Sequence, residues 1–142
     1  MTARLLAMAA VAALMVACGD DNSTATSPTA PTTSSASVTY AGTIDAGGSR
    51  FYSFTNAAAG SITAFLASVT TTDTRVPLAL PLELGIGTPA GTGCATTTTQ
   101  IVAPGLVSQM NVSLATGVFC LRVADAGELK GPVTFAVRFI HP

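Results

Sequence analysis

The chain has 142 residues, of which 49% are hydrophobic and 9% are charged, and its formal net charge at pH 7 is −1. An average soluble domain has about 25% charged residues, so charge is sparse here. Because the balance is slightly acidic and no basic cluster exists, the composition argues against nucleic acid as a partner.

The first 17 residues have the features of an export signal. Arg4 supplies a positive charge, residues 5–16 form an uninterrupted apolar run, and Ala17 is a small residue at a cleavage position. The run is too short to span a bilayer, which requires about 20 apolar residues. Residues 1–17 are therefore predicted to be a signal peptide. A secretory signal followed by an unrelated cysteine, or a short buried helix, is the alternative.

The cysteine after this segment predicts a membrane anchor. The string LMVAC at 14–18 resembles the lipobox of bacterial lipoproteins, in which the cysteine is acylated and becomes the first residue of the mature chain. The resemblance implies lipidation of Cys18. Gly19 stands where some lipoprotein families have an aspartate that retains them in the inner membrane. The resemblance therefore favours the outer membrane, facing the periplasm or the cell surface.

Lipidation also explains an odd number of cysteines. If acylation consumes Cys18, then Cys94 and Cys120 remain as one pair, and an oxidising compartment favours a disulfide between them. On the loop-entropy model, closing a loop of about 27 residues stabilises a fold by roughly 3 to 4 kcal/mol. A reactive or metal-binding pair would be the alternative, but the only histidine, His141, lies at the C-terminus.

The chain then divides into a linker and one domain. After Cys18, the residues to 37 are mainly Ser, Thr, Ala, Pro and Asp without apolar periodicity, so residues 18–37 are predicted to be a disordered tether. Residues 38–142 are enough for a single domain with one core.

Short apolar segments in this domain predict an all-β fold. Strands are expected at 39–44, 50–55, 61–68, 82–87, 109–114, 118–123 and 133–140. Alternation within them predicts two antiparallel sheets packed about 10 Å apart. The predicted core consists of Tyr52, Phe54, Leu82, Leu84, Ile86, Met110, Val112, Leu114, Phe119, Leu121, Val123, Phe135, Val137 and Phe139.

The segments between the predicted strands read as turns and loops. Residues 45–48 and 56–60 have turn composition, and residues 69–81 give no strand signal, so a long surface loop is expected there. The Gly- and Thr-rich segment after Gly87, which contains Cys94, is also expected to be a loop. Cys120 alternates with Phe119 and Leu121, so it should point away from the core, where a disulfide would pin that loop across the sheet.

Five of these segments together resemble a known family. RFYSFT at 50–55, GSIT at 60–63, LELGI at 82–86, LATGVFCLRV at 114–123 and GPVTFAV at 131–137 are similar in order and spacing to bacterial pre-peptidase C-terminal (PPC) domains. The resemblance implies a jelly-roll-like β-sandwich appended to exported proteins. Members often have an Asp-x-Asp-rich central strand linked to calcium, whereas LELG here has a single acid. With no peptidase in this chain, a protease-accessory role would be exercised in trans.

Catalysis is not expected. Nucleophilic triads need a histidine that can reach the nucleophile, and His141 is expected to lie on a mobile tail. The carboxylates of the domain form no acid–base motif, and no cofactor motif is present. Asp125 and Glu128, three residues apart, are a weak calcium candidate, with solvated turn residues as the alternative.

Two functions remain open. The first is a non-enzymatic, membrane-anchored module, expected to be a monomer, that binds an envelope protein or glycan. Arg50, Arg122 and Arg138 are its candidate ligand-facing residues, provided that they share one sheet face, because arginine pairs well with carboxylates. The alternative for them is that they are solvated strand positions that oppose aggregation. The second function is an accessory or processing adjunct of a secreted hydrolase.

We predict that Cys18 is acylated and begins the mature chain. Intact-mass analysis of membrane-extracted protein should show a chain that starts at Cys18 with the added mass of acyl groups. A Cys18→Ser variant should move from the membrane fraction to the soluble fraction, since no second anchor is predicted. An unmodified, soluble wild-type chain would contradict the lipobox interpretation.

Overall fold

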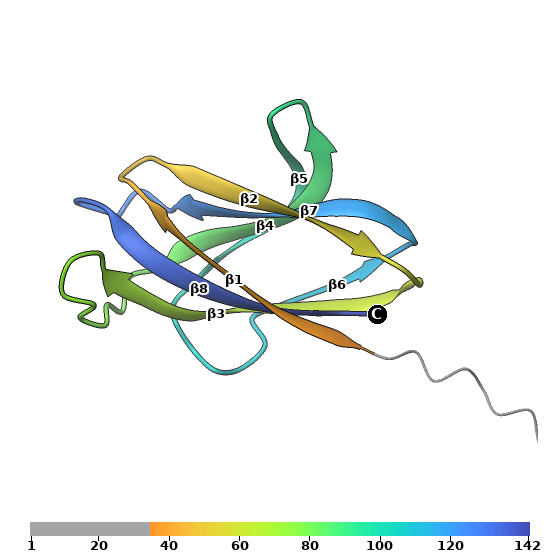
Figure 1. The fold of residues 1–142 in the computed structure, drawn as a ribbon, viewed down its shortest axis with the longest axis horizontal. Coiled ribbons are helices and arrows are strands. Elements are labelled where there is room, and N and C mark those ends of the chain that lie inside the picture. Colours follow the sequence, from red (N-terminus) through yellow and green to blue (C-terminus); the bar gives the residue numbers. More distant parts are fainter. Residues whose placement is uncertain (1–34) are drawn as a thin grey trace, which may run out of the picture. The chain divides into compact units, whose positions relative to one another are not determined.

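The computed structural model describes residues 35–142, which form two four-stranded antiparallel sheets packed as a β-sandwich (Figure 1). The predicted signal peptide, Cys18 and most of the predicted linker lie outside the described residues. No helix occurs between residues 35 and 142, so none there is long and apolar enough to cross a membrane. The strands are β1 (Ala36–Ile44), β2 (Ser49–Asn56), β3 (Gly60–Thr71), β4 (Leu82–Ala90), β5 (Gly93–Val102), β6 (Met110–Leu114), β7 (Gly117–Asp125) and β8 (Val133–His141).

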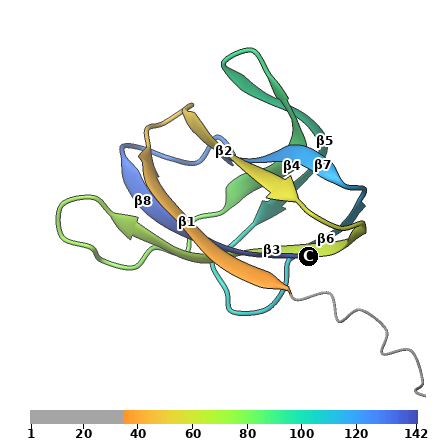
Figure 2. The same ribbon diagram turned by 45° about the vertical axis from the view of Figure 1, so that its right-hand side comes forward.

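The strands pair in a nested order. β4 pairs with β5, β3 with β6, β2 with β7, and β1 with β8, so the first half of the domain folds back on the second. Further pairing of β3 with β8 and of β4 with β7 completes the sheet orders β1-β8-β3-β6 and β2-β7-β4-β5 (Figure 2). This eight-stranded, two-sheet arrangement is a jelly roll, which confirms the predicted fold class.

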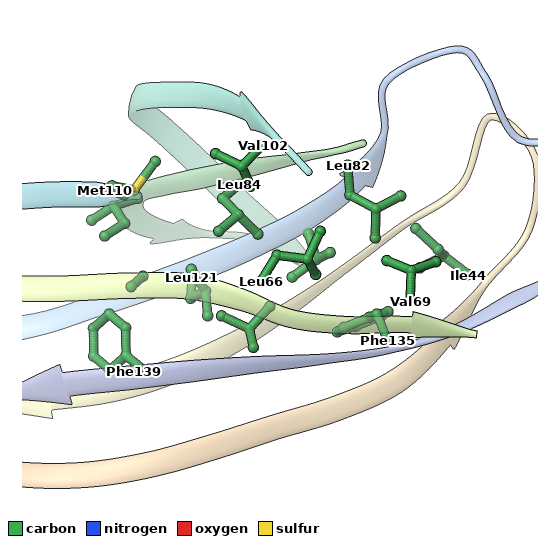
Figure 3. Packing of buried hydrophobic residues seen from close by; sticks show 14 of the residues in the cluster. Ile44, Leu66, Val69, Leu82, Leu84, Val102, Met110, Leu121, Phe135 and Phe139 are labelled. Atoms are coloured by element: carbon green, nitrogen blue, oxygen red, sulfur yellow. The ribbon is translucent and has the colours of Figure 1, made fainter. Parts of the chain in front are cut away.

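The core lies between the two sheets, as the alternation of apolar residues predicted. Leu84 and Leu121 from one sheet and Phe135 and Phe139 from the other are almost fully buried (Figure 3). Every predicted core residue is either buried in this cluster or packed against it. The core also contains residues that the strand pattern did not single out, namely Ile44, Ile62, Ala64, Leu66, Val69, Val102, Leu129 and Val133.

β5 is the one strand that was not predicted, and the expectation of a loop there is wrong. Residues 97–101 are all exposed, so neither side of the strand shows the apolar alternation that marks a half-buried strand. Backbone pairing with β4 defines β5, and Cys94 lies near its start, opposite Pro89. The cysteine therefore belongs to a hairpin rather than to a loop.

Three further differences from the expectation concern β1, β3 and the C-terminus. β1 starts at Ala36, two residues before the predicted domain start. β3 continues to Thr71 and buries Val69, so the expected long loop is shorter and begins after Thr71. His141 ends β8, with its ring centroid 5.6 Å from that of Phe54 and 5.4 Å from that of Phe139, so it is not a mobile tail residue.

Side chains of β2 close the sandwich where edge strands β1 and β2 face each other. Arg50 Nε donates to the Thr43 carbonyl at 2.9 Å, and Tyr52 Oη donates to the Ala41 carbonyl at 2.9 Å. Gly42 lies between these two carbonyls, and a Cβ there would be 2.5 Å from Tyr52 Oη. A glycine is therefore needed for these side chains to cross β1.

The loop before β6 covers the part of β3 that β6 leaves unpaired. Gly105 N–H donates to the Leu66 carbonyl, and Gln109 N–H donates to the Ala64 carbonyl, at 2.8 and 3.1 Å. Gln109 Oε1 accepts from Leu66 N–H at 2.8 Å, so a side chain replaces a strand in the ladder. The edge of this sheet is thereby partly covered by the loop, and β6 itself has only five residues.

Candidate functional site

The candidate site is the side of sheet β2-β7-β4-β5 that points away from the core, called the outer face below. Strand alternation assigns residues to it, because successive side chains point to opposite sides. Leu121 and Val123 of β7 are buried in the core, so Cys120 and Arg122 belong to the outer face. The cross-strand partners of these two residues are Ser53, Phe51, Gly85 and Gly87.

A hairpin covers one end of the outer face. Cys94 of β5 and Cys120 of β7 lie at disulfide distance, with sulfurs 2.02 Å apart and Cα atoms 5.9 Å apart. Cys120 is 0% exposed although it points away from the core, because the β4–β5 hairpin lies over it. Figures 1 and 2 both show the end of this hairpin standing away from the opposite sheet.

Local sequence allows the hairpin to bend. The β4–β5 register shifts between Ile86 and Gly87, which leaves Thr97 as the extra residue, and Thr97 Oγ1 donates to the Ile86 carbonyl at 3.2 Å. A Cβ on Gly87 would lie 1.9 Å from the Ala95 carbonyl oxygen, so only glycine fits at the bend. Bulge, glycine and disulfide together place the hairpin beside the open part of the outer face.

The open part combines an aromatic ring with an ion pair. Phe51 is 39% exposed and lies directly opposite Arg122 across the β2–β7 pair. Arg122 Nη1 is 2.8 Å from Glu83 Oε1 of β4, and both side chains are about one third exposed. Such a pair contributes about 0 to 1 kcal/mol to stability and presents a donor and an acceptor together. Ile101, opposite Glu83, is 60% exposed.

The three candidate arginines do not share one sheet face, so the condition for a common ligand-facing row is not met. Arg50 is on the core side of β2 and bonds to the Thr43 carbonyl, and Arg138 belongs to β8 in the other sheet, where its Nε donates to Ser37 Oγ at 3.0 Å. Only Arg122 lies on the outer face. Alternation already places Arg50 on the same side of its strand as the core residues Tyr52 and Phe54. The assignment of Arg138 to the other sheet, in contrast, depends on long-range strand pairing.

Asp125 has a structural role. Its Oδ1 accepts backbone N–H bonds from Gly127, Glu128 and Leu129 at 2.8, 3.1 and 3.2 Å, and its Oδ2 accepts one from Gly47 at 2.8 Å. The bond from Gly47, followed by the other three, lowers the pKa of the Asp125 carboxyl against the opposing effect of desolvation. Asp125 thus ties the β1–β2 turn to the loop after β7.

Glu128, the other calcium candidate, lines a cavity instead. The cavity has a volume of about 420 Å³ and lies between the loop after β3 and the loop before β8. Leu78, Leu80 and Val133 supply apolar lining, and Lys130 also borders it. Within residues 35–142, no three Asp, Glu, His or Cys side chains gather in a group that could hold a metal ion.

No protein-family model matches the chain, and no curated protein matches its sequence. The similarity to PPC domains therefore stays a prediction made from the sequence.

We predict that removal of either cysteine destabilises the domain, but unequally. Cys94→Ser should lower the free energy of unfolding by about 2 to 4 kcal/mol through loss of the cross-link. Cys120→Ser should lower the free energy of unfolding by about 1 to 3 kcal/mol more, because its hydroxyl would be buried under the hairpin without a hydrogen-bond partner. Denaturant titration of both variants measures the difference. Free alkylation of both thiols in native, exported protein would rule out the cross-link.

We also predict that Asp125 makes stability depend on pH. Since its folded-state pKa is lowered, its charge contributes fully above the unfolded-state pKa of about 4, and the contribution is lost as pH falls through the folded-state pKa. Asp125→Asn should therefore be less stable than wild type at pH 7, and the gap should narrow on acidification. Denaturant titrations at pH 7 and pH 3 test this, with Asp73→Asn as the control. An unchanged gap would contradict the role assigned to Asp125.

Proposed function

We propose that the protein is a non-enzymatic, lipid-anchored cell-envelope module whose outer face binds another protein. The anchor is Cys18, inferred from the lipobox-like sequence, and the outer membrane is the proposed location. The tether before Ala36 would let the sandwich reach a partner away from the membrane. The PPC-like pattern agrees with this, because such domains accompany other exported proteins.

One observation carries the proposal: an exposed aromatic ring, Phe51, lies opposite Arg122 of the Arg122–Glu83 pair, on the same face as the hairpin over Cys120. Partly exposed aromatic residues and arginines are the side chains that contribute most often to protein interfaces. The sequence has no tryptophan, and Phe51 is the one large aromatic among the exposed apolar residues of the described domain. A protein therefore suits this face better than a glycan, which usually needs a broader aromatic platform.

The charged groups support a binding role over catalysis. Asp125 binds four backbone N–H groups, Glu83 binds Arg122, and His141 packs against two phenylalanines. These contacts stabilise the fold. The alternative function, an adjunct of a secreted hydrolase acting in trans, uses the same face and differs only in the partner.

Chemical cross-linking in intact envelopes, followed by purification of the full chain, tests the proposal. Wild type should recover a defined protein, and Phe51→Ser should reduce recovery about tenfold through loss of the central apolar contact. Val76→Ser, which removes an apolar side chain exposed to 52% on a loop, should leave recovery unchanged. Recovery of a single secreted hydrolase would select the alternative. Recovery of polysaccharide, or equal recovery with Phe51→Ser, would refute protein binding by this face.

A further inference from the structure

β5 is an unusually open edge strand. Edge strands expose unpaired backbone N–H and C=O groups, and proteins commonly protect them with charge, proline, short length or a covering loop. In the described domain, β1 and β2 are joined by side chains, β6 is short, and part of β3 is covered by a loop. β5 has ten residues, contains no proline, and pairs on one side only, with β4.

β5 itself has no charged residue. The whole stretch 84–121, which includes β5 and β6, contains no Asp, Glu, Lys, Arg or His. The bulge at Thr97 bends the part of β5 that precedes it. Residues 98–102, in contrast, keep a regular register with Leu82–Ile86 on β4. Within this regular segment, residues 98–101 are exposed and Ile101 is 60% exposed.

We propose that this edge pairs with the same edge of a second copy of the chain, in an antiparallel dimer about a two-fold axis at Gln100. Such an axis places Thr98 opposite Val102 of the partner, Thr99 opposite Ile101, and Gln100 opposite Gln100. Every residue of the regular segment then has a partner. The two amides can donate to and accept from each other, and the exposed Ile101 gains a neighbour.

The self-complementary sequence favours a second copy over an unrelated strand. A two-fold axis brings identical residues together, so a charge on the paired strands would repel its own copy, and β5 has none. The dimer would join two sheets into one continuous eight-stranded sheet and set two outer faces side by side. This inference concerns the strand edge, and it does not depend on the binding function proposed for the outer face.

Two variants that place opposite charges at position 100 test the pairing. Full-length protein, extracted in detergent, should show concentration-dependent dimers in sedimentation velocity. Gln100→Lys alone and Gln100→Glu alone should each weaken the dimer about tenfold or more, because two like charges face each other at the axis. An equimolar mixture of the two variants should recover dimers, which a folding defect would not allow.

Two controls locate the contact. Thr92→Lys, at the turn of the same hairpin, and Ser113→Lys, on exposed edge strand β6, should leave dimerisation unchanged. A monomeric wild type at all concentrations would overturn the proposal, as would dimers that are disrupted by Ser113→Lys but not by Gln100→Lys. Failure of the mixed variants to associate would overturn the register at Gln100.

Discussion

Antiparallel pairing of β8 with both β1 and β3 is the interaction on which the rest of the domain depends. β8 is the last strand, yet it lies inside its sheet and buries Phe135, Val137 and Phe139 against the opposite sheet. Except for β4 with β5, every strand pair joins segments far apart in the sequence. The entropy of closing these loops must be offset by apolar burial, so this small domain needs almost every strand to supply core residues.

The edge strands of the two sheets are stabilised in different ways. Tyr52 packs between Tyr40, with centroids 4.7 Å apart, and Phe135, with centroids 6.4 Å apart, and the same side chain bonds to β1. Desolvation there raises the pKa of both tyrosines. The opposite edge has no comparable aromatic bridge. β5 instead depends on β4 and on the cross-link from Cys94 to the centre of its sheet.

Five charged side chains of this domain hold strands and turns together. Arg50 and Arg138 bond to β1, Arg122 bonds to Glu83, and Asp125 gathers the backbone of two turns. The binding proposed for the outer face and for the β5 edge would therefore use exposed apolar side chains, one ion pair and unpaired backbone groups. Surfaces of this kind bind through shape and hydrogen-bond register, and long-range electrostatic steering contributes little to their association.

The sequence by itself determined the fold class and most of the core. Residues such as Leu82, Leu84 and Ile86 alternate because one side of their strand is buried, so their pattern carries the information locally. It also indicated that Cys120 points away from the core and needs Cys94. The predicted signal peptide and the predicted acylation of Cys18 rest on a different kind of information, since export signals are recognised as sequence and require no fold.

Only the tertiary structure decided the rest. β5 was not predicted, because a strand exposed on both sides has no alternation of apolar and polar residues. Its backbone pairing with β4 cannot be read from the sequence of residues 97–101. Sheet order separated Arg138 from Arg50 and Arg122, because which strands share a sheet follows from long-range pairing. Phe51 became a candidate binding residue only when strand pairing placed it opposite Arg122. The sequence thus specifies which residues are buried, whereas strand order specifies which exposed residues meet.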